Sequence, residues 1–216
     1  MMKRILFFAA LALLVASCEK DPDFDKLDAD LAVYTDHSST FGFDKVETYY
    51  LPDSILEAGG YRASYWTDNN ARQIINQAAA CMDAYGYKRI TDWKLKNTAD
   101  VGLQLSYVAQ RNQVTQVGGF GGWWDYGFWG PWYSGWYYPY AVSYTYDTNT
   151  FIMEMVDLKA DKQQASAKLP VVWYAQASGF MYGGRYNLQL LTNAVSQAFK
   201  QSSSIFNHLL MQNNKK

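Results

Sequence analysis

The chain has 216 residues, with 19 Lys or Arg against 20 Asp or Glu, so its formal net charge at pH 7 is −1. This balance excludes the strongly basic surface with which proteins bind nucleic acid. Hydrophobic residues make up 49% of the chain, which is long enough to bury a core, and one globular domain is the expected count.

The N-terminus has the features of a lipoprotein signal peptide. Two basic residues precede an apolar run over residues 5–16. This run is too short to cross a bilayer core about 30 Å thick and is typical of a secretory signal. The small residues of "VAS" stand directly before Cys18, as a lipoprotein signal peptidase requires. We therefore expect a signal peptide over residues 1–17, acylation of Cys18, and a membrane anchor in the cell envelope, at the outer membrane, with either face possible. An ordinary secretory peptide is the alternative.

Residues 18–30 are predicted to form an acidic, solvated tether. Asp21, Asp23 and Asp25 have a spacing seen in calcium loops. However, Lys26 and Ala32 stand where such a loop needs a glycine and a glutamate. A tether is therefore the favoured interpretation.

Two strands are predicted in the first part of the domain. Apolar residues alternate from Leu27 to Val33, which is typical of a half-buried strand. "TDHSSTFG" follows as a loop. "DKVETYYLP" predicts a second strand that Pro52 ends, followed by a loop that contains "EAGG".

The strongest pattern predicts a helix that begins at Asp68 or Asn69 and ends at Gly86. Asp and Asn are good N-caps, and Gly favours a helix end. Cys81 lies within the apolar stripe, which indicates a buried, unreactive thiol. With Cys18 acylated, Cys81 has no intramolecular disulfide partner. The stripe consists of Ala71, Ile74, Ile75, Ala78, Cys81, Met82 and Tyr85.

The rest of the chain predicts further strands and a final helix. "ADVGLQLSYVAQ" alternates, "AVSYTYDTNTFIMEMVDL" predicts a hairpin with its turn at residues 147–150, and "LPVVWYAQASG" predicts a last strand. Apolar residues recur at helical spacing over 188–199, and a further set at 205–210 continues or kinks that helix. The order indicates an α+β fold over residues 31–216: a single mixed or antiparallel sheet, two main helices on one face, and a long Gly/Trp/Tyr-rich insertion at about 118–140.

This order and several local motifs resemble a known family of lipoproteins that carry the domain of unknown function 4136 (DUF4136). The matching pieces are "DFDKLDADLAVYTDHSSTFGFDKVETYYLPDS", "YGYKRI", "ADVGLQLSYV" and "FIMEMVDLKADKQQASAKLPVVWYAQASG". The resemblance implies a lipidated cysteine, the Ala99-Asp100-Val101 strand start, and a hairpin with Asp157 and Trp173. It brings no activity and no catalytic residues. The aromatic insertion is longer than the family pattern requires.

No arrangement of residues predicts a particular reaction, metal or cofactor. The two histidines have no second ligand at metal spacing. "GGFGG" lacks the lysine and the helix start of a phosphate loop. Two carboxylate pairs, Asp44 with Glu47 and Asp157 with Asp161, would suit glycoside hydrolysis, which needs only two acids. A carbohydrate-binding or carbohydrate-active protein is therefore the alternative function.

The segment from Gly118 to Tyr146 holds fourteen aromatic residues and one charge, Asp125. Its glycines and Pro131 exclude a regular helix. The rings could pack on their own domain. Each ring, however, buries about 150–250 Å² when covered, so covering all fourteen is difficult. Exposed rings would bind a protein partner, rest at a membrane interface or stack on a glycan, in that order of preference. The candidate binding residues are Trp123, Trp124, Trp129, Trp132, Tyr133, Trp136 and Tyr137.

The sequence therefore predicts a lipid-anchored envelope protein with a non-catalytic binding or scaffolding role. Its anchor is the acylated Cys18, and its contact surface is the aromatic segment. The partner is expected to be an envelope protein or a glycan, and no nucleic acid.

Overall fold

The computed structural model describes residues 32–58, 64–108, 136–137, 139, 149–160, 169–178, 181–182, 185–186 and 188–206. They all belong to one compact unit, Leu31–Lys216. The predicted signal peptide, Cys18 and the tether over 18–30 lie outside the described residues. So does the first arm of the hairpin predicted at 141–158.

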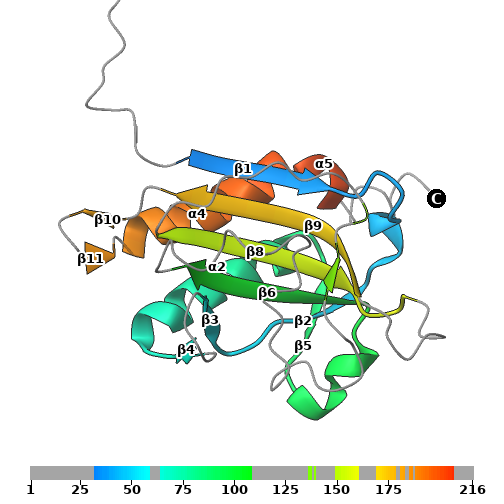
Figure 1. The fold of residues 1–216 in the computed structure, drawn as a ribbon. Coiled ribbons are helices and arrows are strands. Elements are labelled where there is room, and N and C mark those ends of the chain that lie inside the picture. Colours follow the sequence, from blue (N-terminus) through cyan, green and yellow to red (C-terminus); the bar gives the residue numbers. More distant parts are fainter. Residues whose placement is uncertain are drawn as a thin grey trace, which may run out of the picture. The chain divides into compact units, whose positions relative to one another are not determined.

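Nine of the described strands form one mixed sheet (Figure 1). Their bounds are β1 Ala32–His37, β2 Thr48–Tyr50, β3 Ile55–Ala58, β4 Ser64–Trp66, β5 Lys88–Ile90, β6 Val101–Val108, β7 Trp136–Tyr137, β8 Thr150–Asp157 and β9 Leu169–Ser178. Strands β1, β9, β8 and β6 lie side by side and are antiparallel, which makes the centre of the sheet. The described residues also include a separate hairpin, β10 Met181–Tyr182 with β11 Arg185–Tyr186.

Parallel strands extend the sheet beyond β6. β2 pairs with the beginning of β6 and β3 with its end, so two short strands share one edge of a long strand. β5 pairs in parallel with β2, and β4 pairs antiparallel with β3. The parallel step from β2 to β5 needs a crossover, and the helix α2 lies in it.

Two long helices, α2 Asn69–Ala84 and α4 Leu188–Gln201, cover the same face of the sheet (Figure 1). A short helix, α5 Ser203–Phe206, follows α4, and two 3-10 helices, η3 Phe43–Lys45 and η4 Trp93–Thr98, connect strands. This arrangement confirms the predicted α+β class with two main helices on one face. Within the described ranges, no helix is long and apolar enough to cross a membrane.

The main core lies between these helices and the sheet. Leu103 of β6, Met155 of β8 and Trp173 of β9 are paired across three neighbouring strands, so their side chains share the helix-covered face. The apolar stripe predicted for α2 packs against this face, with Cys81 and Tyr85 only partly buried. The core residues of the two helices are Ala71, Ile74, Ile75, Ala78, Ala79, Met82, Leu191, Ala194, Val195, Ala198 and Phe199.

A cluster of aromatic rings closes the end of the core next to α5. The Phe206 ring lies 5.3 Å from the rings of both Trp173 and Phe199, and 5.8 Å from that of Phe43. The buried indole of Trp173 donates to Ser202 Oγ at 2.8 Å. Ser202 stands between α4 and α5, where the chain bends. The sequence left open whether residues 205–210 continue or kink the helix; in the described part, which ends at Phe206, α4 ends at Gln201 and a separate short helix begins at Ser203.

Several predicted boundaries are wrong. β1 runs from Ala32 to His37, so "TDH" belongs to a strand and not to a loop. Part of the predicted second strand is the 3-10 helix η3, and Glu57 and Ala58 of the predicted loop lie in β3. β3, β4 and β5 were not predicted. Each is only three or four residues long, and so short a run cannot show a period of two.

Candidate functional site

The predicted binding residues lie almost wholly outside the described residues. This holds for Cys18 and for Trp123, Trp124, Trp129, Trp132 and Tyr133. The backbones of Trp136 and Tyr137 are described, and they form β7, which pairs in parallel with Leu169 and Pro170 of β9. The structure therefore tests neither the acylation nor the exposure of these rings.

The described residues on either side of the aromatic insertion are joined to each other. Val108, the last residue of β6, is paired with Thr150, the first residue of β8. Asn149 N also donates to Val108 O at 2.8 Å. The β6–β8 ladder is therefore complete where the chain leaves it, and forty residues, 109–148, are inserted at the point where a short turn would close a hairpin.

β7 lies at the opposite end of the sheet from this point. Its partners, Leu169 and Pro170, begin β9, whereas Phe151 at the start of β8 pairs with Ala177 near the end of β9. The chain between Val108 and Trp136 thus connects the two ends of the central strands. The insertion is therefore joined to the sheet after Val108, at one end of the central strands, and again through β7, at their other end.

The face of the sheet opposite α2 and α4 carries a row of polar side chains. Residues that are directly paired point to the same face. One paired row crosses four strands as Gln104 of β6, Glu154 of β8, Tyr174 of β9 and Asp36 of β1. We call these four residues the polar row. None of the helices in the described ranges covers this face (Figure 1).

Hydrogen bonds along each strand connect the polar row to the row beside it. Gln104 Nε2 donates to Ser106 Oγ at 3.0 Å, and Tyr174 OH donates to Gln176 Oε1 at 2.9 Å. The polar row is buried at its centre, where Glu154 and Tyr174 are 0% exposed, and opens towards β1.

The accessible end of the polar row combines a phenol with a carboxylate. Tyr34 OH donates to Asp36 Oδ2 at 3.0 Å, and the Tyr34 ring is exposed at 41%. Partial burial, and after it the hydrogen bond to Asp36, raise the pKa of Tyr34. The phenol therefore stays protonated and remains a donor at neutral pH. This edge presents hydrogen-bonding groups, and no described side chain there is placed to act as a nucleophile.

Of the carboxylates singled out for glycoside hydrolysis, Asp44 lies in η3 and Glu47 is exposed just before β2. A carboxylate that was not singled out, Asp100, accepts through Oδ2 from Thr48 N at 2.9 Å, from Thr48 Oγ1 at 2.8 Å and from Glu47 N at 3.0 Å, which joins β6 to the start of β2. Asp157 Oδ1 accepts from Lys159 N at 2.8 Å in the turn after β8. Asp161, the predicted partner of Asp157, lies outside the described residues.

Cys81 fits its predicted structural role. Its thiol is partly buried on α2, and Gln77 Nε2 lies 3.8 Å from Sγ. Burial raises the pKa of Cys81, which keeps the thiol protonated and weakly nucleophilic at neutral pH. Of the described residues, no group of three His, Cys, Asp or Glu side chains could hold a metal ion.

The chain is similar to proteins of one known family. The family model for the domain of unknown function DUF4136 matches residues 33–202. The chain belongs to the DUF4136 family. A crystal structure of a DUF4136 family protein from Bacteroides thetaiotaomicron is 38% identical, has a TM-score of 0.71, and the match covers 82% of this chain and 98% of that one. No curated protein matches the chain.

Two further solved structures match the chain at lower similarity. A PelC dodecamer from Paraburkholderia phytofirmans is 15% identical with a TM-score of 0.40, over 82% of this chain and 98% of that one. A PDZ domain protein from Parabacteroides distasonis is 12% identical with a TM-score of 0.40, over 80% of this chain and 36% of that one. At this similarity neither informs the function of the chain.

The motif residues that carry the DUF4136 resemblance hold the fold together. Asp100 fixes β2 against β6, and Trp173 fixes β9 against the bend between α4 and α5. Gly86, in "YGYKRI", has a φ of 90°, a conformation that favours glycine, and it ends α2 before β5. In this chain these residues therefore have structural roles.

Sequence reasoning missed the polar row. The alternation in "VGLQLSYV" was read only for its apolar side, although Gln104 and Ser106 occupy the other side. Glu154 stands among apolar residues in "FIMEMV", which is a second signal. The two signals share one surface only through the β6–β8 register, which the sequence does not reveal.

Proposed function

We propose that this DUF4136 protein is a lipid-anchored lipoprotein of the cell envelope that binds a protein partner through its aromatic insertion, residues 118–146. Cys18 would carry the acyl anchor, and the domain would hold the insertion beside the membrane. The role is binding or scaffolding, without catalysis.

The closed β6–β8 ladder is the observation that carries this proposal. Because Val108 pairs with Thr150, the central antiparallel strands need only a short turn where the chain has forty residues. An addition of this length, rich in Trp and Tyr, is typical of a contact surface.

The test combines in-cell crosslinking with a change of the rings. A photo-crosslinking amino acid at Tyr133 should capture an envelope protein in intact cells, and Trp129→Ala with Trp132→Ala should abolish that capture. Tyr65→Ala is the matched control, because Tyr65 is an exposed aromatic residue of β4, at 41%, outside the insertion. The control should leave the captured protein unchanged.

Thermal unfolding of the purified double variant decides between binding and packing. Under the proposal its Tm stays within a few degrees of that of the parent protein, because the replaced rings are not part of the core. A loss of cooperative unfolding would show that the rings are core residues, and the proposal would fail.

A further inference from the structure

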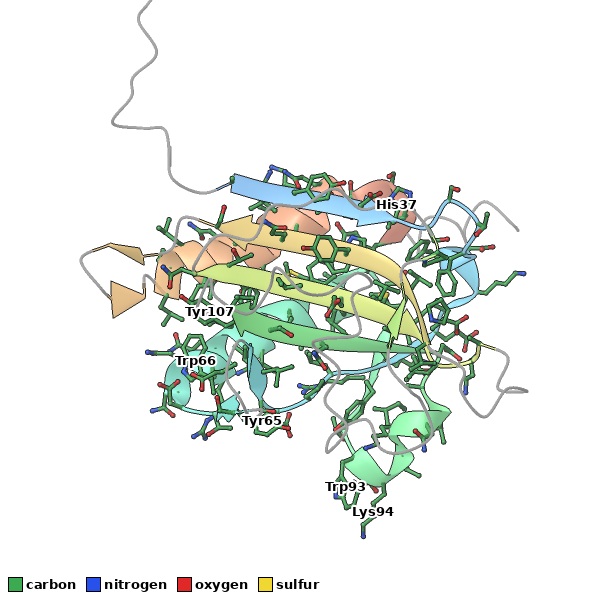
Figure 2. The ribbon with its side chains drawn as sticks, viewed as in Figure 1. His37, Tyr65, Trp66, Trp93, Lys94 and Tyr107 are labelled. Carbon is green, nitrogen blue, oxygen red and sulfur yellow. The ribbon has the colours of Figure 1, made fainter. Side chains whose placement is uncertain are left out.

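A projecting 3-10 helix carries the two most exposed large apolar side chains of the described residues. Trp93 is 63% exposed and Leu95 50%, and both belong to η4. η4 extends away from the sheet, with Trp93 and Lys94 at its outer end (Figure 2). We call residues 91–95, all of which are exposed, the η4 tip. Two large apolar side chains held in water at a projecting point indicate a contact surface.

The η4 tip has one anionic and one cationic residue, Asp92 and Lys94, and it lies within a basic stretch of a chain that is slightly acidic. Residues 88–98 contain four cationic residues, Lys88, Arg89, Lys94 and Lys96, and one anionic residue, Asp92, whereas the whole chain has a net charge of −1. A further cation, Lys159, donates from Nζ to Thr98 O at 2.9 Å at the end of η4. Arg89 is paired with Asp53 at 2.8 Å and Lys96 is buried, so the exposed Lys88, Lys94 and Lys159 supply the accessible positive charge.

The η4 tip is held in place by its own hydrogen bonds. Asp92 caps the helix by accepting from Lys94 N at 2.9 Å, and Thr98 Oγ1 donates to Leu95 O at 2.7 Å. Lys96 is buried below the tip, and its Nζ lies 5.9 Å from the centre of the Trp93 ring. This cation–π contact restricts the motion of the Trp93 ring, so less side-chain freedom is lost when the tip meets a surface.

We propose that the η4 tip contacts an anionic lipid bilayer: Trp93 and Leu95 enter the headgroup region while Lys94 and Lys159 lie among the phosphates. The proposal deepens the proposed function, because an envelope anchor brings the domain to a bilayer, and it assigns the face that meets the lipid. It concerns a part of the chain separate from the aromatic insertion.

The composition of the tip favours lipid over protein. Lysine is depleted in the centre of protein interfaces. At membrane surfaces, by contrast, lysine is enriched beside Trp and Leu, because the long side chain reaches the phosphates while the apolar groups enter the interface. Tryptophan settles at the headgroup level. Alternation of Trp, Lys and Leu over three residues thus fits a bilayer whose headgroups are negatively charged.

An environment-sensitive fluorescent amino acid at position 95 of the full chain tests the inference. The same probe at position 200, an exposed site on α4, is the control. Vesicles contain phosphatidylglycerol and phosphatidylethanolamine, or phosphatidylcholine alone. On the anionic vesicles we expect a blue-shifted emission at 95 and iodide quenching reduced by about threefold or more, as for a group placed 5–10 Å into the interface. The probe at 200 should stay in water, and Lys94→Glu should restore most of the quenching at 95.

The possible outcomes distinguish bilayer contact by the η4 tip from membrane anchoring through Cys18. Mass spectrometry of the same sample reads acylation of Cys18. An acylated, vesicle-bound chain whose probe at 95 is quenched as strongly as the probe at 200 would overturn the inference and leave the anchor intact. Protection at 95 in an unacylated chain would support the inference and remove the anchor. Protection at 95 in cells but not on vesicles would also overturn it, because the tip would then meet a protein.

Discussion

At the scale of single residues, two neighbouring carboxylates show how local contacts set the charge of an acid. Burial alone would raise the pKa of Asp100, but the hydrogen bonds from Thr48 and Glu47 outweigh it and hold that pKa below its usual value. Burial raises the pKa of Asp157, and the hydrogen bonds from Lys159 and Ala160 do not offset it. The contributions of the two carboxylates to the stability of the folded state should therefore change in opposite directions with pH.

Asp100→Ala should destabilise the domain by about 2–3 kcal/mol at pH 7, because the backbone N–H groups of Glu47 and Thr48 lose a charged acceptor. Asp100→Asn keeps an acceptor and should cost less, about 1 kcal/mol. Because the pKa of Asp100 is lowered on folding, its contribution is present above the unfolded value near 3.9 and is lost as pH falls through the folded value. Urea unfolding at pH 7 and pH 3 measures both. A gap between parent and Asp100→Asn that does not shrink at pH 3 would contradict this assignment.

Asp157→Asn is the matched comparison at the other carboxylate. Asn keeps an oxygen that accepts from Lys159 N, which lies 2.8 Å away, and removes a charge that burial disfavours. A raised pKa stabilises the folded state at low pH, and that contribution is lost as pH rises through the folded value. The variant should therefore equal or exceed the parent in stability at pH 7 and lose this advantage at pH 3. A large loss of stability at pH 7 would mean that the charge of Asp157 is needed.

At the scale of elements, the sequence predicted the long helices and strands. It did not predict the short strands or the pairing between strands. α2 and β6 were found because each shows its apolar period over eight residues or more, and β9 was predicted from the segment "LPVVWYAQASG". β2 and β3 share one edge of β6, a pairing across about fifty residues that no local pattern encodes. The same limit applies to function, since the polar row exists only through strand register. The η4 tip was also missed, because "TDWKLKNT" is too short to show a face.

The hydrogen bond between Trp173 of β9 and Ser202, which follows α4, is expected to stabilise the domain. Ser202→Ala leaves the buried indole N–H of Trp173 without its acceptor and should cost about 1–3 kcal/mol. Trp173→Phe removes the donor and leaves a space, at a cost of about 2 kcal/mol. Since both remove one hydrogen bond, the double variant should cost less than the two together. A double-mutant cycle by urea unfolding measures the difference, and strict additivity would show that this bond does not stabilise the bend.

At the scale of the whole molecule, the two faces of the sheet differ in what lies on them. α2 and α4 bury one face of the sheet. The polar row lies on the other face, and the η4 tip projects from the loop between β5 and β6.

The membrane anchor is the whole-molecule property on which the proposed role depends, and Cys18→Ala tests it. We expect the variant to lose the acyl mass and to move from the membrane fraction to the wash. The folded unit Leu31–Lys216 begins beyond Cys18, so its thermal unfolding should be unchanged. Cys81→Ala is the control, because it removes the other cysteine, one that lies within α2, and should leave the protein acylated and membrane-bound. If Cys18→Ala stays in the membrane fraction after a carbonate wash, something other than an acyl chain holds the protein there, and the η4 tip alone is too small a surface to do so.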